Sequence, residues 1–185
     1  MAAAQPEARE VFDSCVSCED CVPLAWRKRE AALSEGELYR LQEQTLRALR
    51  AEPVDAHEQK DPEMLRVHEK LDALMEIVGK LLALHQPAPA ARDLKMSRRG
   101  VAWSQPLPDA PAIGERGVIE LHLFPRLLQP LLLPARVSHV RALDGTAQVE
   151  IVFEPISEPV ESALERHVFR RHRRAIAETR HRKTA

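Results

Sequence analysis

Three cysteines near the start of the chain are the residues best suited to metal chemistry. Cys15, Cys18 and Cys21 stand at equal spacing, and thiolates spaced in this way can wrap an iron–sulfur cluster. The chain has no fourth cysteine, so tetrahedral zinc would need an oxygen ligand such as Asp13 or Glu19. The alternative is that the thiols are small apolar or surface residues. We expect this alternative, with no metal and no cofactor.

Positive charge near the C-terminus forms a second group of candidate residues. The whole chain has a formal net charge of −1, whereas residues 161–185 contain eight Lys/Arg and three Asp/Glu. The run at 166–174, Arg-His-Val-Phe-Arg-Arg-His-Arg-Arg, could contact phosphates through its charges. Because no aromatic stacking series or base-reading motif accompanies the run, we expect a solvated helix face and no nucleic-acid partner.

Spacings typical of a catalytic centre do not occur in the sequence. There is no nucleophile elbow, phosphate-binding glycine loop, His-Glu-x-x-His pair or dinucleotide fingerprint, and the chain contains only six glycines. His122 and His139 fall in strand-like segments without a carboxylate at a recognisable spacing. We therefore expect a protein that binds or signals, and no enzyme.

Length and composition limit the class of protein further. A chain of 185 residues suits one small domain with a helical extension. Its apolar runs are far shorter than the roughly 20 residues of a membrane-spanning helix. The first ten residues fit neither a secretory signal nor a transit peptide, and three neighbouring cysteines cannot form a disulfide framework. We expect a cytoplasmic protein without membrane insertion.

Two helices are expected in the first half of the chain. Residues 22–26, Val-Pro-Leu-Ala-Trp, predict a short strand, which its proline would place at a sheet edge. Ser34 and Glu37 then have the spacing of a capping box and predict a helix over 34–51. Asp-Pro-Glu at 61–63 is typical of a helix start and predicts a second helix over about 62–85.

The second helix carries an apolar face wide enough for self-assembly. Apolar residues recur at alternating steps of three and four, which is the heptad pattern, and flanking positions widen the face beyond a two-stranded seam. The predicted oligomerisation residues are Met64, Val67, Leu71, Leu74, Met75, Ile77, Val78, Leu81 and Leu82. Two compatible arrangements would bury them: a bundle of about four helices from separate chains, or a hairpin with the helix over 34–51. A hairpin packed on the β domain without any oligomer is the simpler alternative.

The second half of the chain changes from helical to strand-like patterns. Residues 86–92 are rich in proline and predict a linker. Strand-like runs follow at 100–103, 118–124, 131–143 and 146–153. Asp144-Gly145 between the last two is a strong hairpin signal. These runs predict a small antiparallel sheet or barrel, and a helix from Glu161 to about Arg180 could close one end of it.

Residues 93–103, Asp-Leu-Lys-Met-Ser-Arg-Arg-Gly-Val-Ala-Trp, together with the later strands and the helix at 164–174, resemble a PilZ domain over about 90 residues. With the Pro-Leu-x-Trp strand at 23–26 and the inserted heptad helices, nearly the whole chain is similar to the atypical tetrameric PilZ group of proteobacteria. The resemblance implies an α+β fold: a PilZ-like antiparallel β-barrel of six strands with inserted coiled-coil helices and a C-terminal helix. The chain then divides into an N-terminal segment with the first barrel strand (1–33), an inserted helical oligomerisation region (34–86), and the remaining barrel with its C-terminal helix (93–185).

PilZ domains are receptors for cyclic di-GMP, and their signature is Arg-x-x-x-Arg before the barrel and Asp/Asn-x-Ser-x-x-Gly on the next strand. Ser97 and Gly100 occupy the serine and glycine positions, whereas Lys95 replaces the Asp/Asn, and no Arg-x-x-x-Arg precedes residue 22. The resemblance implies a ligand site at Lys95, Ser97, Arg98, Arg99 and Gly100. The alternative for Ser97 and Gly100 is a plain turn, in which glycine supplies a positive φ and serine bonds the backbone.

The function implied by the resemblance is a non-enzymatic regulatory adaptor in cyclic di-GMP signalling. It would form a homotetramer through its heptad helices and bind the nucleotide or an unknown signalling protein. The alternative function is a ligand-free oligomeric scaffold or protein-interaction module.

Overall fold

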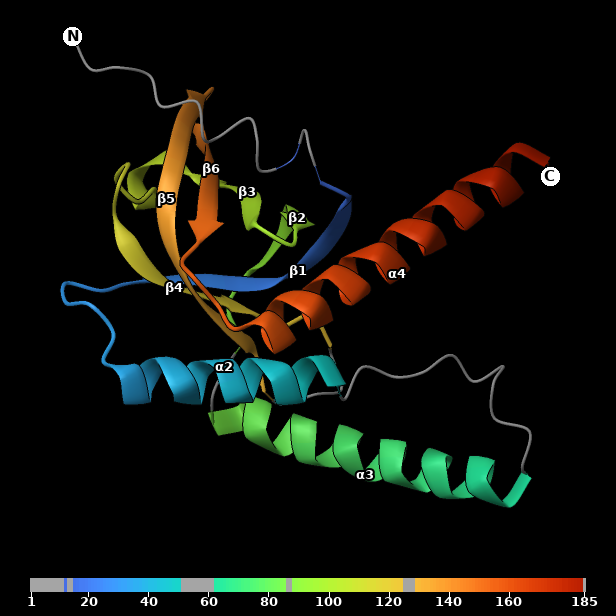
Figure 1. Ribbon diagram of the computed structural model, residues 1–185. Helices are drawn as coiled ribbons and strands as arrows, with labels where there is room; N and C mark the ends of the chain where they lie inside the picture. Colours follow the sequence, from blue (N-terminus) through green and yellow to red (C-terminus); the bar gives the residue numbers. More distant parts are fainter. Residues whose placement is uncertain (1–11, 13–14, 51–61, 86–87, 125–128, 185) are drawn as a thin grey trace, which may run out of the picture.

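The computed structural model describes residues 12, 15–50, 62–85, 88–124 and 129–184 (Figure 1). Within these residues lie six strands, three α-helices and a short 3₁₀ helix. In chain order these are β1 (Ser17–Lys28), α2 (Glu35–Arg50), α3 (Pro62–His85), β2 (Ala91–Ser97), β3 (Gly100–Pro106), η2 (Leu107–Asp109), β4 (Arg116–Leu121), β5 (Leu131–Leu143), β6 (Thr146–Phe153) and α4 (Glu158–Thr184).

The six strands form a closed antiparallel barrel in the order β1-β2-β3-β6-β5-β4. This confirms the predicted α+β fold of a barrel with inserted helices and a C-terminal helix. The β5–β6 hairpin turns at Asp144 and Gly145, which both have positive φ, as the Asp-Gly pair predicts. The strand β2 was missed from the sequence pattern, and its first residues lie in the segment expected to be a linker.

The long strand β1 closes the barrel by changing partners midway. Its first half pairs with β2 as far as Pro23 opposite Ala91, and its second half pairs with β4 from Leu24 opposite Leu121. The expected edge position of this strand is therefore wrong, because β1 has a neighbour on both sides. Pro23 stands at the change of partner, and its carbonyl still accepts the His122 N–H at 3.0 Å.

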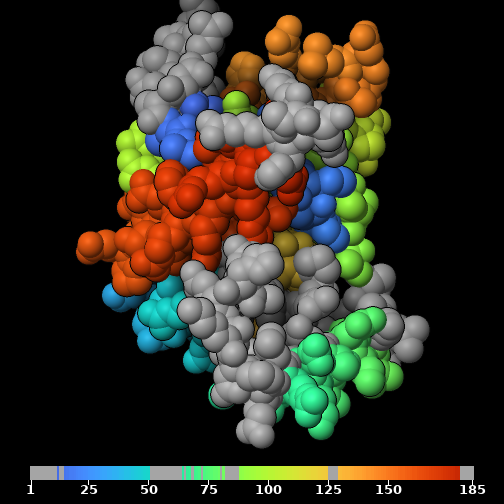
Figure 2. All heavy atoms as spheres, turned by 90° about the vertical axis from the view of Figure 1, so that its right-hand side faces the viewer, coloured from blue at the N-terminus to red at the C-terminus, as the bar shows by residue number. Residues whose placement is uncertain are grey.

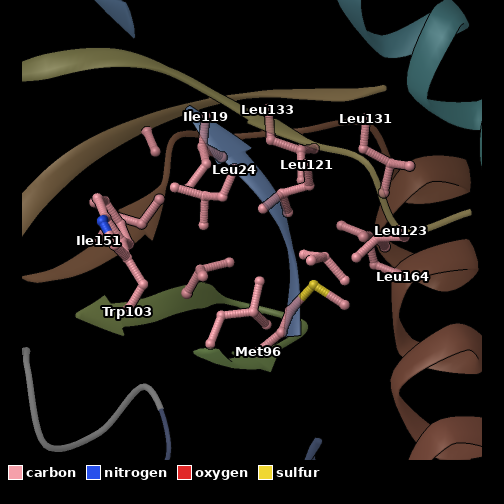
Figure 3. Close-up of a cluster of buried hydrophobic side chains, with 14 of the residues drawn as sticks. Leu24, Met96, Trp103, Ile119, Leu121, Leu123, Leu131, Leu133, Ile151 and Leu164 are labelled. Atoms are coloured by element: carbon pink, nitrogen blue, oxygen red, sulfur yellow. The ribbon is translucent and has the colours of Figure 1, made fainter. Parts of the chain in front are cut away.

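The apolar core fills the barrel and continues under one helix. Side chains from every strand and from α4 point into one cluster (Figure 3), including Leu24, Met96, Trp103, Ile119, Leu121, Leu131, Leu133, Ile151 and Leu164. From α4, Val160, Leu164 and Val168 are fully buried. The prediction that the terminal helix closes one end of the barrel is therefore consistent with this packing.

The helix α2 belongs to the barrel domain. Its N-terminus has the predicted capping box: the Ser34 N–H donates to Glu37 Oε2 at 2.9 Å, and the Glu37 N–H donates to Ser34 Oγ at 3.4 Å. The Ser34 hydroxyl also donates to Glu37 Oε2 at 2.7 Å, and this bond, followed by that from the Ser34 N–H, lowers the pKa of Glu37 to about 2. Further along, the buried Thr45 Oγ1 donates to the Leu132 carbonyl at 2.9 Å and accepts the Leu132 N–H at 3.0 Å. With Leu46 and Leu49 also buried, α2 packs its apolar face on β5 and α4.

The helix α3, in contrast, leaves its apolar face in solvent. Figure 1 shows it at the edge of the molecule, and within the described residues it has no extended packing partner. Eight of the predicted oligomerisation side chains are 37–58% exposed: Met64, Val67, Leu71, Leu74, Met75, Ile77, Val78 and Leu81. The side chain of Leu82 lies outside the described residues. The hairpin alternative is therefore wrong for the single chain, because α2 buries its apolar residues on the barrel.

Gly117 provides a test of the β1–β4 pairing. A Cβ atom at this position would lie 2.5 Å from Trp26 Cζ2 and 2.6 Å from the Arg27 carbonyl oxygen. Because backbone must move to relieve the second contact, we expect Gly117→Ala to lower the free energy of unfolding by about 1–3 kcal/mol in urea titrations.

The matched control for this test is Gly36→Ala in α2, where an added Cβ meets nothing within 4 Å. Alanine should stabilise this helix by about 0.5–1 kcal/mol. A Gly117→Ala protein as stable as the wild type would show that the β1–β4 pairing is looser than described.

Candidate functional site

The turn between β2 and β3 contains the serine and glycine of the predicted ligand site. Ser97 is fully buried, and its Oγ accepts the Arg99 N–H at 3.1 Å and donates to the Gly100 carbonyl at 3.5 Å. The Ser97 hydroxyl therefore shapes the turn, as the plain-turn alternative expects. Gly100 does not supply a positive φ, since the glycines with positive φ in the described part of the chain are Gly114 and Gly145.

The two arginines of the turn differ in their surroundings. Arg98 reaches α4, where its Nη1 lies 3.2 Å from Glu161 Oε1 and its Nε lies 4.0 Å from Glu165 Oε1. A hydrogen bond with Cys15, with added attraction from these two carboxylates, raises the pKa of Arg98. Arg99 is exposed. Arg98 thus ties the turn to the C-terminal helix, and Arg99 faces solvent.

Lys95 lies apart from these arginines, on the outer face of the barrel. The strand register places Glu19 beside it on β1, Ala102 on the other side on β3, and Glu150 next to Ala102 on β6. The Lys95 Nζ atom also lies 5.2 Å from the centroid of the Phe12 ring. A neighbouring carboxylate is therefore built into the sheet beside this lysine.

Two hollows are each lined by one of the predicted ligand residues. The outer hollow, of about 690 Å³, contains Lys95 and four carboxylates, those of Glu19, Asp20, Asp93 and Glu150. The α4 hollow, of about 480 Å³, lies between the start of β1, the β2–β3 turn and α4, and its lining includes Arg98, Glu165, Arg166 and Phe169. The structure therefore brings Lys95 and Arg98 to separate places. The outer hollow is acidic, and the α4 hollow has more basic than acidic side chains.

Part of the basic C-terminal run is structural. Arg171 pairs with Asp20 of β1, and His172 Nδ1 lies 2.9 Å from the Ser17 carbonyl oxygen. His167 is buried, with its ring 5.4 Å from that of Phe124. The solvated face expected for this run is thus only one side of the helix. Figure 2 shows α4 lying across this face of the molecule against β1.

Arg166 and Phe169 are residues whose place in a site the sequence did not reveal. Both lie on the exposed side of α4 and line the α4 hollow near the turn. The sequence signal was present in the run at 166–174, but its position beside Arg98 depends on how α4 docks on the barrel.

The three cysteines do not converge. Cys18 points into the core, where burial raises the pKa of its thiol to about 11. Cys21 lies on the exposed outer face, and a hydrogen bond with Asp93 raises its pKa. No group of three or more metal-ligating side chains occurs in the described ranges, and Asp13 lies outside them. The alternation of strand β1 thus separates thiols that the sequence spacing suggested could meet.

No helix in the described part of the chain is both long enough and apolar enough to cross a membrane.

Comparison with known proteins identifies one family. The model of the atypical PilZ domain, cyclic di-GMP receptor, matches residues 44–181. A crystal structure from Xanthomonas campestris, a tetrameric PilZ domain self-assembled via a helical bundle, has 27% sequence identity and a TM-score of 0.72 over 95% of this chain and 96% of that one. YcgR from Escherichia coli in complex with c-di-GMP has 20% identity and a TM-score of 0.40 over 48% of this chain and 38% of that one. No curated protein matches.

The structural role of the buried Ser97 hydroxyl can be tested by replacing the serine with alanine. Ser97→Ala leaves the Arg99 N–H without its partner, so we expect the free energy of unfolding to fall by about 1–3 kcal/mol in urea titrations. The control is Ser104→Ala, at an exposed position of the neighbouring strand β3. This variant should change the free energy of unfolding by no more than about 0.5 kcal/mol. Equal stability of the two variants would contradict the structural role of Ser97.

Proposed function

The chain belongs to the atypical PilZ domain family of cyclic di-GMP receptors, and from this premise we propose that it is a non-enzymatic regulatory adaptor in cyclic di-GMP signalling that works as a homotetramer. The family match over residues 44–181 is the observation that carries the signalling role, because it covers most of the barrel and both later helices. A cytoplasmic location is part of the proposal, and the three free cysteines suit a reducing compartment.

The proposed tetramer rests on the exposed apolar face of α3. Eight side chains at heptad and flanking positions are at least 37% exposed, and so continuous an apolar surface is typical of an interface. The face is wider than a two-stranded coiled coil covers, which favours a bundle of more helices. The similar chain from Xanthomonas campestris is a tetrameric PilZ domain that self-assembles via a helical bundle, and this supports four as the number of copies.

The helix α3, which carries the proposed assembly surface, is close along the chain to the β2–β3 turn. The helix α3 ends at His85, β2 begins at Ala91, and the turn follows directly at Ser97. A bundle that holds the end of α3 therefore also restrains the strand that leads to the turn. We propose that this short connection couples assembly to the signalling surface of the barrel.

Direct contact with the nucleotide is proposed at the β2–β3 turn. Of the candidate residues Lys95, Ser97, Arg98, Arg99 and Gly100, the two arginines offer charge and forked donors that suit phosphate. Ser97 holds the shape of the turn through its hydroxyl. Gly100 begins β3, opposite Val152. Lys95 faces the acidic outer hollow, where four carboxylates oppose an anionic ligand.

A second candidate function is a ligand-free oligomeric scaffold or protein-interaction module. The acidic lining of the outer hollow favours it, since Lys95 stands where the family signature has Asp/Asn and is outnumbered by carboxylates. In this case an unknown signalling protein would be the partner, and the tetramer would present four barrels to it.

Leu74→Asp tests the assembly. Wild-type protein should have a molar mass of four times the 20.9 kDa chain by light scattering after gel filtration. A carboxylate in the centre of an apolar bundle loses its hydration without a partner, so the variant should have a lower mass. The control Leu107→Asp changes another exposed leucine that lies outside α3, and this variant should remain tetrameric. A monomeric wild type would refute self-assembly.

Titration calorimetry with cyclic di-GMP separates the two candidate functions. Binding with an affinity that falls between low and moderate salt is expected for a receptor whose arginines contact phosphate. If no heat of binding is measured up to high micromolar nucleotide, direct binding of cyclic di-GMP is refuted and the scaffold function is favoured. The molar mass measured by light scattering is independent of this outcome.

A further inference from the structure

The α4 hollow has the size and the variety of side chains of a small-molecule site. Its volume of about 480 Å³ lies within the range of about 300–1,000 Å³ that is usual for ligand pockets. One wall is apolar, with Val16 and Phe169 each about half exposed. The other wall has charged groups from both the turn and α4.

Two guanidinium groups line this hollow from different elements. Arg98 comes from the β2–β3 turn and is held in place by Glu161 at 3.2 Å. Arg166 comes from α4, is exposed, and forms no ion pair with any described residue. A guanidinium can form paired hydrogen bonds with two acceptors, such as guanine O6 and N7 or two phosphate oxygens. The hollow therefore offers forked donors that are absent from the outer hollow.

The aromatic ring of Phe169 is positioned as a stacking surface. It is 50% exposed, and Arg173 Cζ lies 5.9 Å from the ring centroid. Bases stack on such rings in nucleic-acid-binding proteins, often with a contribution from a neighbouring arginine. Large exposed aromatic side chains are few in this chain, since it has only one tyrosine, two tryptophans and four phenylalanines.

Glu165 supplies an acceptor pair beside the arginines. Its carboxylate is largely exposed and lies 4.0 Å from Arg98 Nε at its nearer oxygen. Guanine carries adjacent N–H donors at N1 and N2, which can bond to both oxygens of a carboxylate, whereas adenine lacks a donor at N1. A carboxylate next to arginines and an aromatic ring therefore matches guanine better than adenine.

We propose that the α4 hollow is a guanine pocket that holds one base of a cyclic dinucleotide. Phe169 stacks on the base, Glu165 accepts from its N1 and N2 donors, and Arg166 donates to O6 and N7. Arg98 and the exposed Arg99 next to it bind the phosphate that follows the base. The inference rests on the proposed function for the class of ligand, and it moves the base to α4, away from the acidic face at Lys95.

The test is calorimetric titration of the full-length protein with cyclic di-GMP and with cyclic di-AMP. Wild-type protein should bind cyclic di-GMP at least about tenfold more tightly than cyclic di-AMP. Arg166→Ala and Phe169→Ala should each weaken cyclic di-GMP binding about tenfold, because they remove a fork and a stacking surface. Glu165→Gln should weaken cyclic di-GMP binding and leave cyclic di-AMP binding unchanged.

Matched controls change similar exposed residues elsewhere. Arg141→Ala removes an exposed arginine from β5, and Tyr39→Ala removes an exposed aromatic side chain from α2. Both variants should bind cyclic di-GMP with an affinity within about twofold of that of the wild type. Arg166→Lys keeps the charge and loses the fork, so it should bind less tightly than the wild type. Circular dichroism and molar mass are measured for each variant to check its folding and its assembly. Because the substituted side chains are exposed, neither the spectrum nor the mass should change.

The possible outcomes distinguish this pocket from the proposed function. Wild-type binding that Arg166→Ala and Phe169→Ala leave unchanged would refute the pocket and keep the receptor role. Equal binding of the two dinucleotides would refute guanine recognition by Glu165. Failure of the wild type to bind cyclic di-GMP would refute the receptor role itself, and the pocket with it.

Discussion

The packing of α2 on the barrel decides how the rest of the protein can be arranged. Thr45 forms two hydrogen bonds with the backbone of Leu132, and the apolar side chains beside it are buried against β5 and α4. Because the apolar face of α2 is occupied in this way, α3 has no extended packing against another helix in the described part of the chain. Its described apolar side chains are exposed in the single chain, and the proposed self-assembly rests on this exposure.

Docking of α4 organises the other end of the molecule. The helix buries Leu164 in the barrel core and pairs Arg171 with Asp20 of β1. Glu161 of the same helix binds Arg98 of the β2–β3 turn. The turn, the start of β1 and α4 are therefore held together as one unit. The α4 hollow lies where these three elements meet.

Electrostatics distinguishes the two surfaces that could receive a ligand. The outer hollow has one lysine among four carboxylates, whereas the α4 hollow has Arg98 and Arg166 with Glu165. The carboxylates of the first hollow oppose an anionic ligand, whereas the lining of the second carries more positive than negative charge.

The sequence alone determined the features that depend on neighbours in the chain. The heptad face of α3, the capping box at Ser34 and the Asp-Gly hairpin were all predicted, because local spacing specifies helix faces, caps and turns. The family was indicated by the resemblance of whole segments to a PilZ domain. Only the tertiary structure decided that β1 changes partners at Pro23, that α2 packs on the barrel, and that Lys95 and Arg98 face different hollows. It also brought Arg166 and Phe169 beside a turn about 70 residues earlier in the chain. Such contacts depend on barrel closure and on the docking of α4, which local spacing does not encode.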